Sequence, residues 1–308
     1  MSQNTLLYGD GLATAQYINL ARDLSFLNSK NHEHSDRDGN VLGYICNIKV
    51  HSPTQAALTL WVAPNTWKMR NSFKKWHAYR DLMFKEAGAT GSEIGRYGHT
   101  IRPYMDSSMK AATILEPIGW DLTSQTQEWS YTQIAAAPGF DSAAVGTEGR
   151  AAVDVYDLHI CGANVGTNTA LGTTYYSSVG MIHSYNQDRM EVVTPTLDSQ
   201  TIEGQNNPLA LLKQGGSVSG GEVMDIVEDQ ELEAPPYDIT DNGWSTTSIP
   251  ADIIQMTPGW DGAASVASQK STQLFVPAGL LYIASTVAQA DAILMIDVVG
   301  IVRCKDLA

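Results

Sequence analysis

The chain has 308 residues, of which 43% are hydrophobic and 17% charged, and its formal net charge is −14 at pH 7. This apolar content excludes an intrinsically disordered protein, and the acidic charge argues against nucleic-acid binding through the whole surface. The length suits two domains of about 150 residues each. The three cysteines, Cys46, Cys161 and Cys304, form no CxxC motif, so we expect buried free thiols rather than a disulfide framework.

The first regular elements along the chain are two strands, at residues 42–50 and 56–62. In both, every second residue is apolar, which is typical of a strand with one buried face. The residues expected on the buried faces are Leu42, Tyr44, Cys46, Ile48 and Val50, followed by Ala56, Leu58, Leu60 and Val62. Because only a short turn separates the two strands, we predict that they pair as a hairpin or meander.

A helix is predicted next, at about residues 65–87, with Asn65 as its N-cap and Gly88 as its stop signal. It carries six of the 19 Lys and Arg residues of the chain. We favour a core helix with a solvated face. The alternative is that its basic, Trp-bearing side faces anionic lipid headgroups or packaged DNA. The residues predicted to face lipid or DNA are Lys68, Lys74, Lys75 and Arg80.

Short strand-like runs, separated by residues that favour turns, fill most of the remaining chain and predict a β-sandwich or barrel. They lie at residues 112–115, 131–135, 152–161, 173–178, 181–184, 190–193, 253–256, 273–276, 280–285 and 293–303. A short helix is expected at 208–214. The segment at about 215–242 is rich in carboxylates and reads as an exposed acidic excursion.

Two nearly identical loops stand 120 residues apart, APGFDSAA at 137–144 and TPGWDGAA at 257–264. Each follows a Gly-Trp pair and precedes a strand-like run, which indicates a duplicated β-unit. The alternative is that a common type II turn, which Pro-Gly favours, occurs twice by chance. The turn residues are Pro138, Gly139, Phe140 and Asp141 in the first half, and Pro258, Gly259, Trp260 and Asp261 in the second.

Residues with metal-binding or catalytic chemistry give only weak patterns. His32, His34, Asp36 and Asp38 could bind a divalent metal, but the ligand spacing of a calcium loop is missing, so we favour a solvated loop. Carboxylates at 228–233 could form a glycosidase pair, although an exposed acidic loop is favoured. The motifs of P-loop, dinucleotide-binding and HExxH proteins are absent from the sequence. We therefore predict no catalytic residue, no cofactor and no enzymatic activity.

Taken together, these features resemble a viral family. The repeated β-units, the helix in the first half and the acidic excursion in the second resemble the double jelly-roll major capsid proteins of small icosahedral, lipid-containing ssDNA bacteriophages. The resemblance implies an all-β fold of two tandem jelly-roll barrels, at 1–163 and 164–308, with one amphipathic helix inserted in the first. It also implies a structural protein whose trimeric, pseudo-hexameric capsomers form an icosahedral virion shell, assembled in the host cytoplasm.

The partners implied by this resemblance are other copies of the chain in a homotrimer, neighbouring capsomers, other virion proteins and an inner viral membrane. Sequence-specific contact with nucleic acid is not implied. The first 21 residues contain neither Lys nor Arg, unlike the Arg-rich arm of single jelly-roll capsid proteins, which favours a shell resting on lipid. Two alternatives stay open. One is a carbohydrate-binding or glycoside-active β-sandwich, because seven Trp and 13 Tyr suit stacking on sugars; the other is a phage spike or receptor-binding protein.

Overall fold

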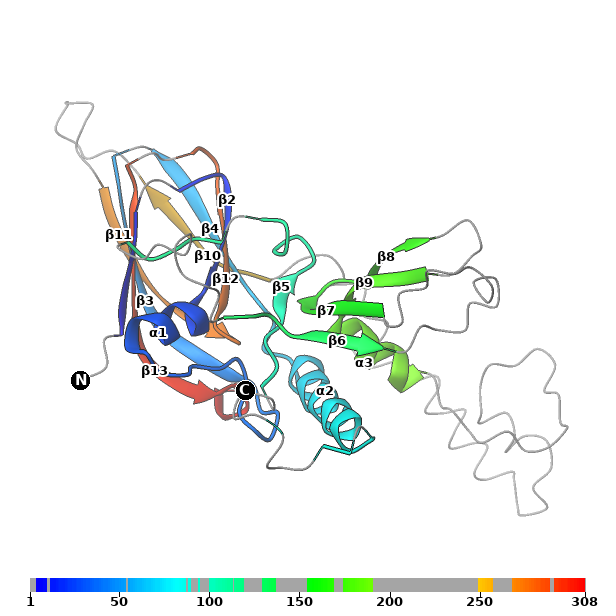
Figure 1. Cartoon of the computed structure of the whole chain (residues 1–308). Helices are drawn as coiled ribbons and strands as arrows, with labels where there is room; N and C mark the ends of the chain where they lie inside the picture. Colours follow the sequence, from blue (N-terminus) through cyan, green and yellow to red (C-terminus); the bar gives the residue numbers. More distant parts are fainter. Residues whose placement is uncertain are drawn as a thin grey trace, which may run out of the picture.

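A computed structural model shows a mostly β-sheet protein with three α-helices in its described part (Figure 1). The structure describes residues 4–9, 12–53, 55–86, 88–89, 94, 100–112, 114–118, 129–136, 154–168, 174–190, 249–256, 268–288 and 291–307. The strands form three sheets. Two of them build a sandwich, and the third lies beside it together with two of the helices (Figure 1).

The sandwich consists of two four-stranded antiparallel sheets. The first sheet contains, in spatial order, β1 (Thr5–Tyr8), β13 (Ile293–Arg303), β3 (Leu42–Ser52) and β11 (Ser268–Pro277). The second contains β10 (Ile249–Met256), β4 (Ala56–Val62), β12 (Leu280–Ser285) and β2 (Ala15–Asn19). Each sheet therefore joins strands from the beginning and the end of the chain.

This pairing corrects the predicted division into barrels at 1–163 and 164–308. Both neighbours of β3 in its sheet, β11 and β13, come from the C-terminal part of the chain. Likewise, β4 lies between β10 and β12. Strands expected in two separate barrels, β3 and β4 of the first and β10 to β13 of the second, thus complete one sandwich, because a half-buried strand can satisfy its backbone groups with any partner of matching pattern.

The predicted hairpin between β3 and β4 is also wrong, although the alternation that suggested two strands is confirmed. Tyr44, Cys46 and Ile48 are fully buried on β3, as are Leu58 and Leu60 on β4. These two apolar faces belong to one core, and two faces can cover each other only when their strands lie in opposite sheets. The short link between the strands therefore crosses from one sheet to the other.

Helix α1 (Leu20–Asn28) follows β2 directly and covers one end of the sandwich core. Asn19 caps it, since its side-chain oxygen accepts the N–H of Arg22 at 3.1 Å. The next residue, Asp23, is fully buried and receives hydrogen bonds from Tyr8 Oη at 2.6 Å and from Arg22 Nε at 2.8 Å. This charged pair and tyrosine tie α1 to strand β1.

The middle of the chain forms the third sheet, in the order β5 (Tyr104–Asp106), β7 (Asp154–Cys161), β9 (Thr174–Gly180) and β8 (Val165–Asn168), with β6 (Gln133–Ala136) also paired to β7. Strand β7 is parallel to β5 and β9 but antiparallel to β6. Helix α3 (Met181–Met190) follows β9, so the strand predicted at 181–184 is wrong. A run of four residues is too short for periodicity to separate a strand from a helix.

The predicted duplication of a β-unit is not matched by the described strands. The last strands of the two predicted units are β7 and β13, and their pairing differs. Strand β7 is parallel to β5 and β9, whereas both neighbours of β13 are antiparallel to it. The eight repeat-turn residues lie outside the described residues, as do the short helix at 208–214 and the acidic excursion at 215–242.

Candidate functional site

Helix α2 (Trp67–Glu86) carries the four basic residues predicted to face lipid or DNA. Its N-cap is Thr66 rather than Asn65, because Thr66 Oγ1 accepts the N–H of Met69 at 3.3 Å while Asn65 Nδ2 donates to the Cys304 carbonyl at 3.1 Å. At the other end, Gly88 has a φ of 73° and its N–H bonds to the Lys85 carbonyl, which confirms the predicted stop.

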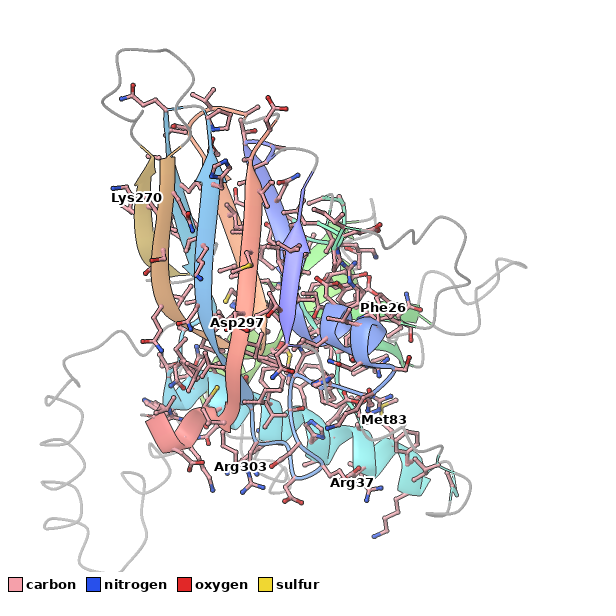
Figure 2. The ribbon with its side chains drawn as sticks, turned by 90° about the vertical axis from the view of Figure 1, so that its left-hand side faces the viewer. Phe26, Arg37, Met83, Lys270, Asp297 and Arg303 are labelled. Carbon is pink, nitrogen blue, oxygen red and sulfur yellow. The ribbon has the colours of Figure 1, made fainter. Side chains whose placement is uncertain are left out.

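One face of α2 is buried and the opposite face is exposed. Met69 and Phe73 are fully buried, and the buried His77 places Nε2 2.8 Å from Ser35 Oγ. Helical spacing then puts Lys74 and Lys75 on the exposed side. In Figure 2, α2 crosses the base of the sandwich.

Arg80 differs from the two exposed lysines because the protein itself holds its guanidinium. It donates a hydrogen bond to the Thr100 carbonyl and lies over the Phe84 ring, 5.6 Å from the ring centre. Burial, with Arg102 nearby, lowers the pKa of Arg80. Lys68 is half-buried. Of the four predicted residues, Lys74 and Lys75 are therefore the two that are exposed.

An aromatic cleft lies beside Lys75, between α2 and α3. The cavity measures about 180 Å³ and is lined by Lys75, Trp76, Tyr79, Ser184 and Tyr185. The Trp76 and Tyr79 rings meet edge to face at 5.5 Å. Aromatic rings beside lysines suit both a membrane interface and the bases of a single strand of nucleic acid, so this face could serve either predicted partner.

Replacing both exposed lysines tests this face. The double variant Lys74→Gln/Lys75→Gln is expected to bind vesicles rich in anionic lipid about 30-fold more weakly, because each Lys near such a surface contributes about 1 kcal/mol. Vesicle sedimentation measures the change, and a labelled single-stranded oligonucleotide is titrated in parallel. The matched control is Lys49→Gln/Lys270→Gln, which removes the same charge from exposed sandwich positions; Lys270 lies well away from α2 (Figure 2). Unchanged binding to both probes would contradict the prediction.

Two of the four candidate metal-binding residues, His34 and Asp36, are oriented toward separate partners. His34 is buried, with Nδ1 at the Ala278 carbonyl and its ring 5.7 Å from that of Trp129. Asp36 accepts the N–H of Asp38 at 3.0 Å and forms an ion pair with Arg303 at 2.8 Å. Across the described ranges, no three His, Cys, Asp or Glu side chains gather as a metal site would require. All three cysteines are buried and free, as expected.

The environment of His34 predicts a loss of stability in acid. Burial is the largest cause that lowers the pKa of His34 from 6.5 to about 4, and nearby Arg102 adds to it. Between pH 4 and pH 6.5, His34 therefore binds a proton in the unfolded chain but not in the folded chain. The contribution of this group to the free energy of unfolding is fully present above pH 6.5 and falls as the pH drops toward 4. We expect a loss of about 3 kcal/mol in the free energy of unfolding across that window.

Denaturant titrations at several pH values measure this loss. Asn places an N–H donor near the position of histidine Nδ1, so His34→Asn keeps a donor for the Ala278 carbonyl while removing the titrating ring. The variant should show a flatter dependence of stability on pH. The control His51→Asn changes an exposed histidine on β3 and should keep the wild-type slope. An equally steep slope in His34→Asn would show that other groups cause the acid sensitivity.

A larger cavity, of about 520 Å³, lies where α1 meets the third sheet. We call it the inter-sheet groove. It is lined by Arg22, Phe26, Tyr104, Glu116, Trp129, Ser130, Tyr131, Gln133 and Asp157. Sequence reasoning missed this site because its residues come from α1, β5, β6, β7 and the segments between them. The one related signal in the sequence was its content of seven Trp and 13 Tyr, which suited stacking on sugars but located no site.

Comparisons with models of protein families, with curated proteins and with solved structures found no match for this chain. Among the helices that the structure describes, none is both long enough and apolar enough to cross a membrane.

Proposed function

We propose that the sandwich is a single jelly roll and that the chain is the subunit of a self-assembling icosahedral virus shell. The order of strands carries this proposal. Successive strands of the sandwich alternate between the two sheets, from β1 to β4 and again from β10 to β13. The exception is the step from β4 to β10, because these two strands pair with each other in the second sheet. Two interleaved Greek keys give this order, and such jelly rolls form viral capsid, lectin and cupin domains.

The filled interior supports a structural role among these possibilities. Leu6, Tyr44 and Ile48 of the first sheet meet Leu58 and Leu60 of the second in one apolar core, and each is at most 1% exposed. A jelly roll that binds a metal or ligand between its sheets needs polar side chains and space there. Close apolar packing instead suits a subunit whose interactions lie on its outer surface.

This proposal differs from the sequence-based one in the number of barrels. A trimeric pseudo-hexamer depends on two barrels per chain, whereas strands predicted for different barrels pair within one sandwich. We therefore propose one barrel per subunit, with residues 63–248 inserted between β4 and β10. Symmetric contacts between many copies of one barrel can close a shell.

Apolar side chains on the outside of the sandwich offer a contact between subunits. Large hydrophobic residues are exposed on adjacent strands β1 and β13, and Figure 2 faces this side of the first sheet. They are Leu7, Ile293, Val299 and Ile301. Val299 is 57% exposed at an irregular point of β13, where the register with β3 shifts. Such exposed apolar groups are typical of surfaces that become buried on association.

Size-exclusion chromatography with light scattering, followed by negative-stain microscopy, tests the proposal. Closed shells or discrete rings of the purified full-length chain are expected. Val299→Glu should prevent assembly because it would bury a carboxylate in the contact. The matched control Ser271→Glu adds the same charge at an exposed position on β11 and should assemble. A wild-type chain that stays monomeric under all assembly conditions would refute the shell proposal.

A further inference from the structure

The inter-sheet groove combines aromatic rings with hydrogen-bonding side chains, and a subunit that only packs into a shell has no need of it. Tyr104 and Tyr131 stack in parallel, with ring centres 3.9 Å apart. Trp129 lies under the guanidinium of Arg102, which is 4.0 Å from the ring centre. The rings along one wall of the groove are therefore held in fixed orientations.

Paired charges also hold the polar groups of the groove in place. Arg22 is bound to Asp23 and donates to the Leu115 carbonyl at 2.7 Å. Asp157 is only 2% exposed, yet it lines the groove, and it accepts hydrogen bonds from Lys110 and from Gln133 Nε2, the latter at 3.1 Å. Polar groups fixed in this way lose little entropy when a ligand binds.

The phenol of Tyr104 adds a hydrogen-bond donor to the same wall. Burial is the largest cause that raises the pKa of Tyr104 to about 12, and Asp157 and Tyr131 add to it. The hydroxyl therefore stays protonated at neutral pH. Beside it, the carboxylates of Asp157 and Glu116 offer acceptors, and the amide of Gln133 offers both a donor and an acceptor.

We propose that the inter-sheet groove binds a neutral oligosaccharide. A sugar ring presents an apolar face that suits the tyrosine rings, and hydroxyl groups that suit amides and carboxylates. Arg22, the one cation among the described lining residues, is already paired with Asp23, so an anionic sugar would meet Glu116 without a free positive partner among these residues. A cavity of about 520 Å³ lies within the range of about 300–1,000 Å³ that small-molecule sites occupy. This site does not depend on the proposed shell.

Isothermal titration of the full-length, unassembled chain with maltotriose and with triacetylchitotriose tests the site. Saturable binding of at least one of these neutral probes is expected. Glu116→Ala and Gln133→Ala should each weaken that binding about tenfold or more, because each removes hydrogen bonds from a desolvated sugar. The matched control Gln269→Ala, at an exposed position on β11, should bind like the wild type. Thermal unfolding confirms that the three variants remain folded.

Three results would overturn the inference. They are no saturable binding of either neutral probe, binding that both groove variants leave unchanged, and binding of sialyllactose in preference to the neutral sugars. The assembly of Glu116→Ala and Gln133→Ala is measured separately. Shells without sugar binding would refute the groove alone, whereas sugar binding by a chain that never assembles would refute the shell and support the carbohydrate-binding alternative.

Discussion

Asp23→Ala is expected to lower the free energy of unfolding by about 3–5 kcal/mol, among the largest effects of any single change in this protein. The carboxylate is fully buried, and its removal leaves the nearly buried Arg22 guanidinium without its charged partner. It also leaves the hydroxyl of Tyr8 without its acceptor. Both polar groups would then be buried without the partner that Asp23 provides, which costs far more than losing an exposed ion pair.

Urea denaturation followed by tryptophan fluorescence measures this loss. Asp38→Ala, which removes an exposed carboxylate, is the control and should change stability by less than about 0.5 kcal/mol. A second comparison uses Arg22→Met/Asp23→Leu, which replaces both charges by apolar groups. That variant should recover most of the stability, because a buried ion pair and a hydrophobic pair of similar volume are often equivalent. Equal losses in Asp23→Ala and in the double variant would contradict the role assigned to the unpaired Arg22.

Gly279→Ala is expected to cost about 2–5 kcal/mol, for two independent reasons. First, Gly279 has a φ of 67°, and a residue with a β-carbon adopts this left-handed conformation at a cost of about 1–2 kcal/mol. Second, the added β-carbon would lie 2.7 Å from the Tyr44 ring. That ring is fully buried and its hydroxyl donates to the Glu33 carbonyl at 2.8 Å, so it has little freedom to move. Overpacking of this kind costs about 1–3 kcal/mol.

Gly300→Ala provides the matched comparison for Gly279→Ala. A β-carbon at Gly300 on β13 would meet no atom within 4 Å, and this glycine does not have a positive φ. The same chemical change should therefore alter stability by less than about 0.5 kcal/mol. If denaturant midpoints fell equally in both variants, the turn at Gly279 would not be the constrained position that the structure describes.

Elements with a strong local pattern were predicted well from the sequence. The run at 293–303 coincides with strand β13, and α2 begins and ends within two residues of its predicted bounds. The alternation in β3 and β4 correctly identified most of their buried residues. In each case the decisive interactions are between a residue and its near neighbours in the chain, or between the apolar face of an element and a core, whichever segments build that core. Period and stop signals report these interactions directly.

The candidate sites were predicted less well, because burial and partners depend on distant segments. Lys74 and Arg80 looked equivalent on a helix of basic character, yet the first is exposed and the second bonds to the Thr100 carbonyl. His34 stood in a polar loop by composition, but it is fully buried against Ala278, 244 residues away in the chain. No local pattern distinguishes such a histidine from a solvated one.

The sequence by itself determined that this protein is largely β-sheet, which face of each main strand is buried, and where the long basic helix lies. Only the tertiary structure decided that β3 pairs with β11 and β13, that the two ends of the chain share one sandwich, and that residues from five segments line the inter-sheet groove. The physical reason is that a period of two specifies which side of a strand is apolar but not which strand lies beside it. That choice depends on the packing of the whole core.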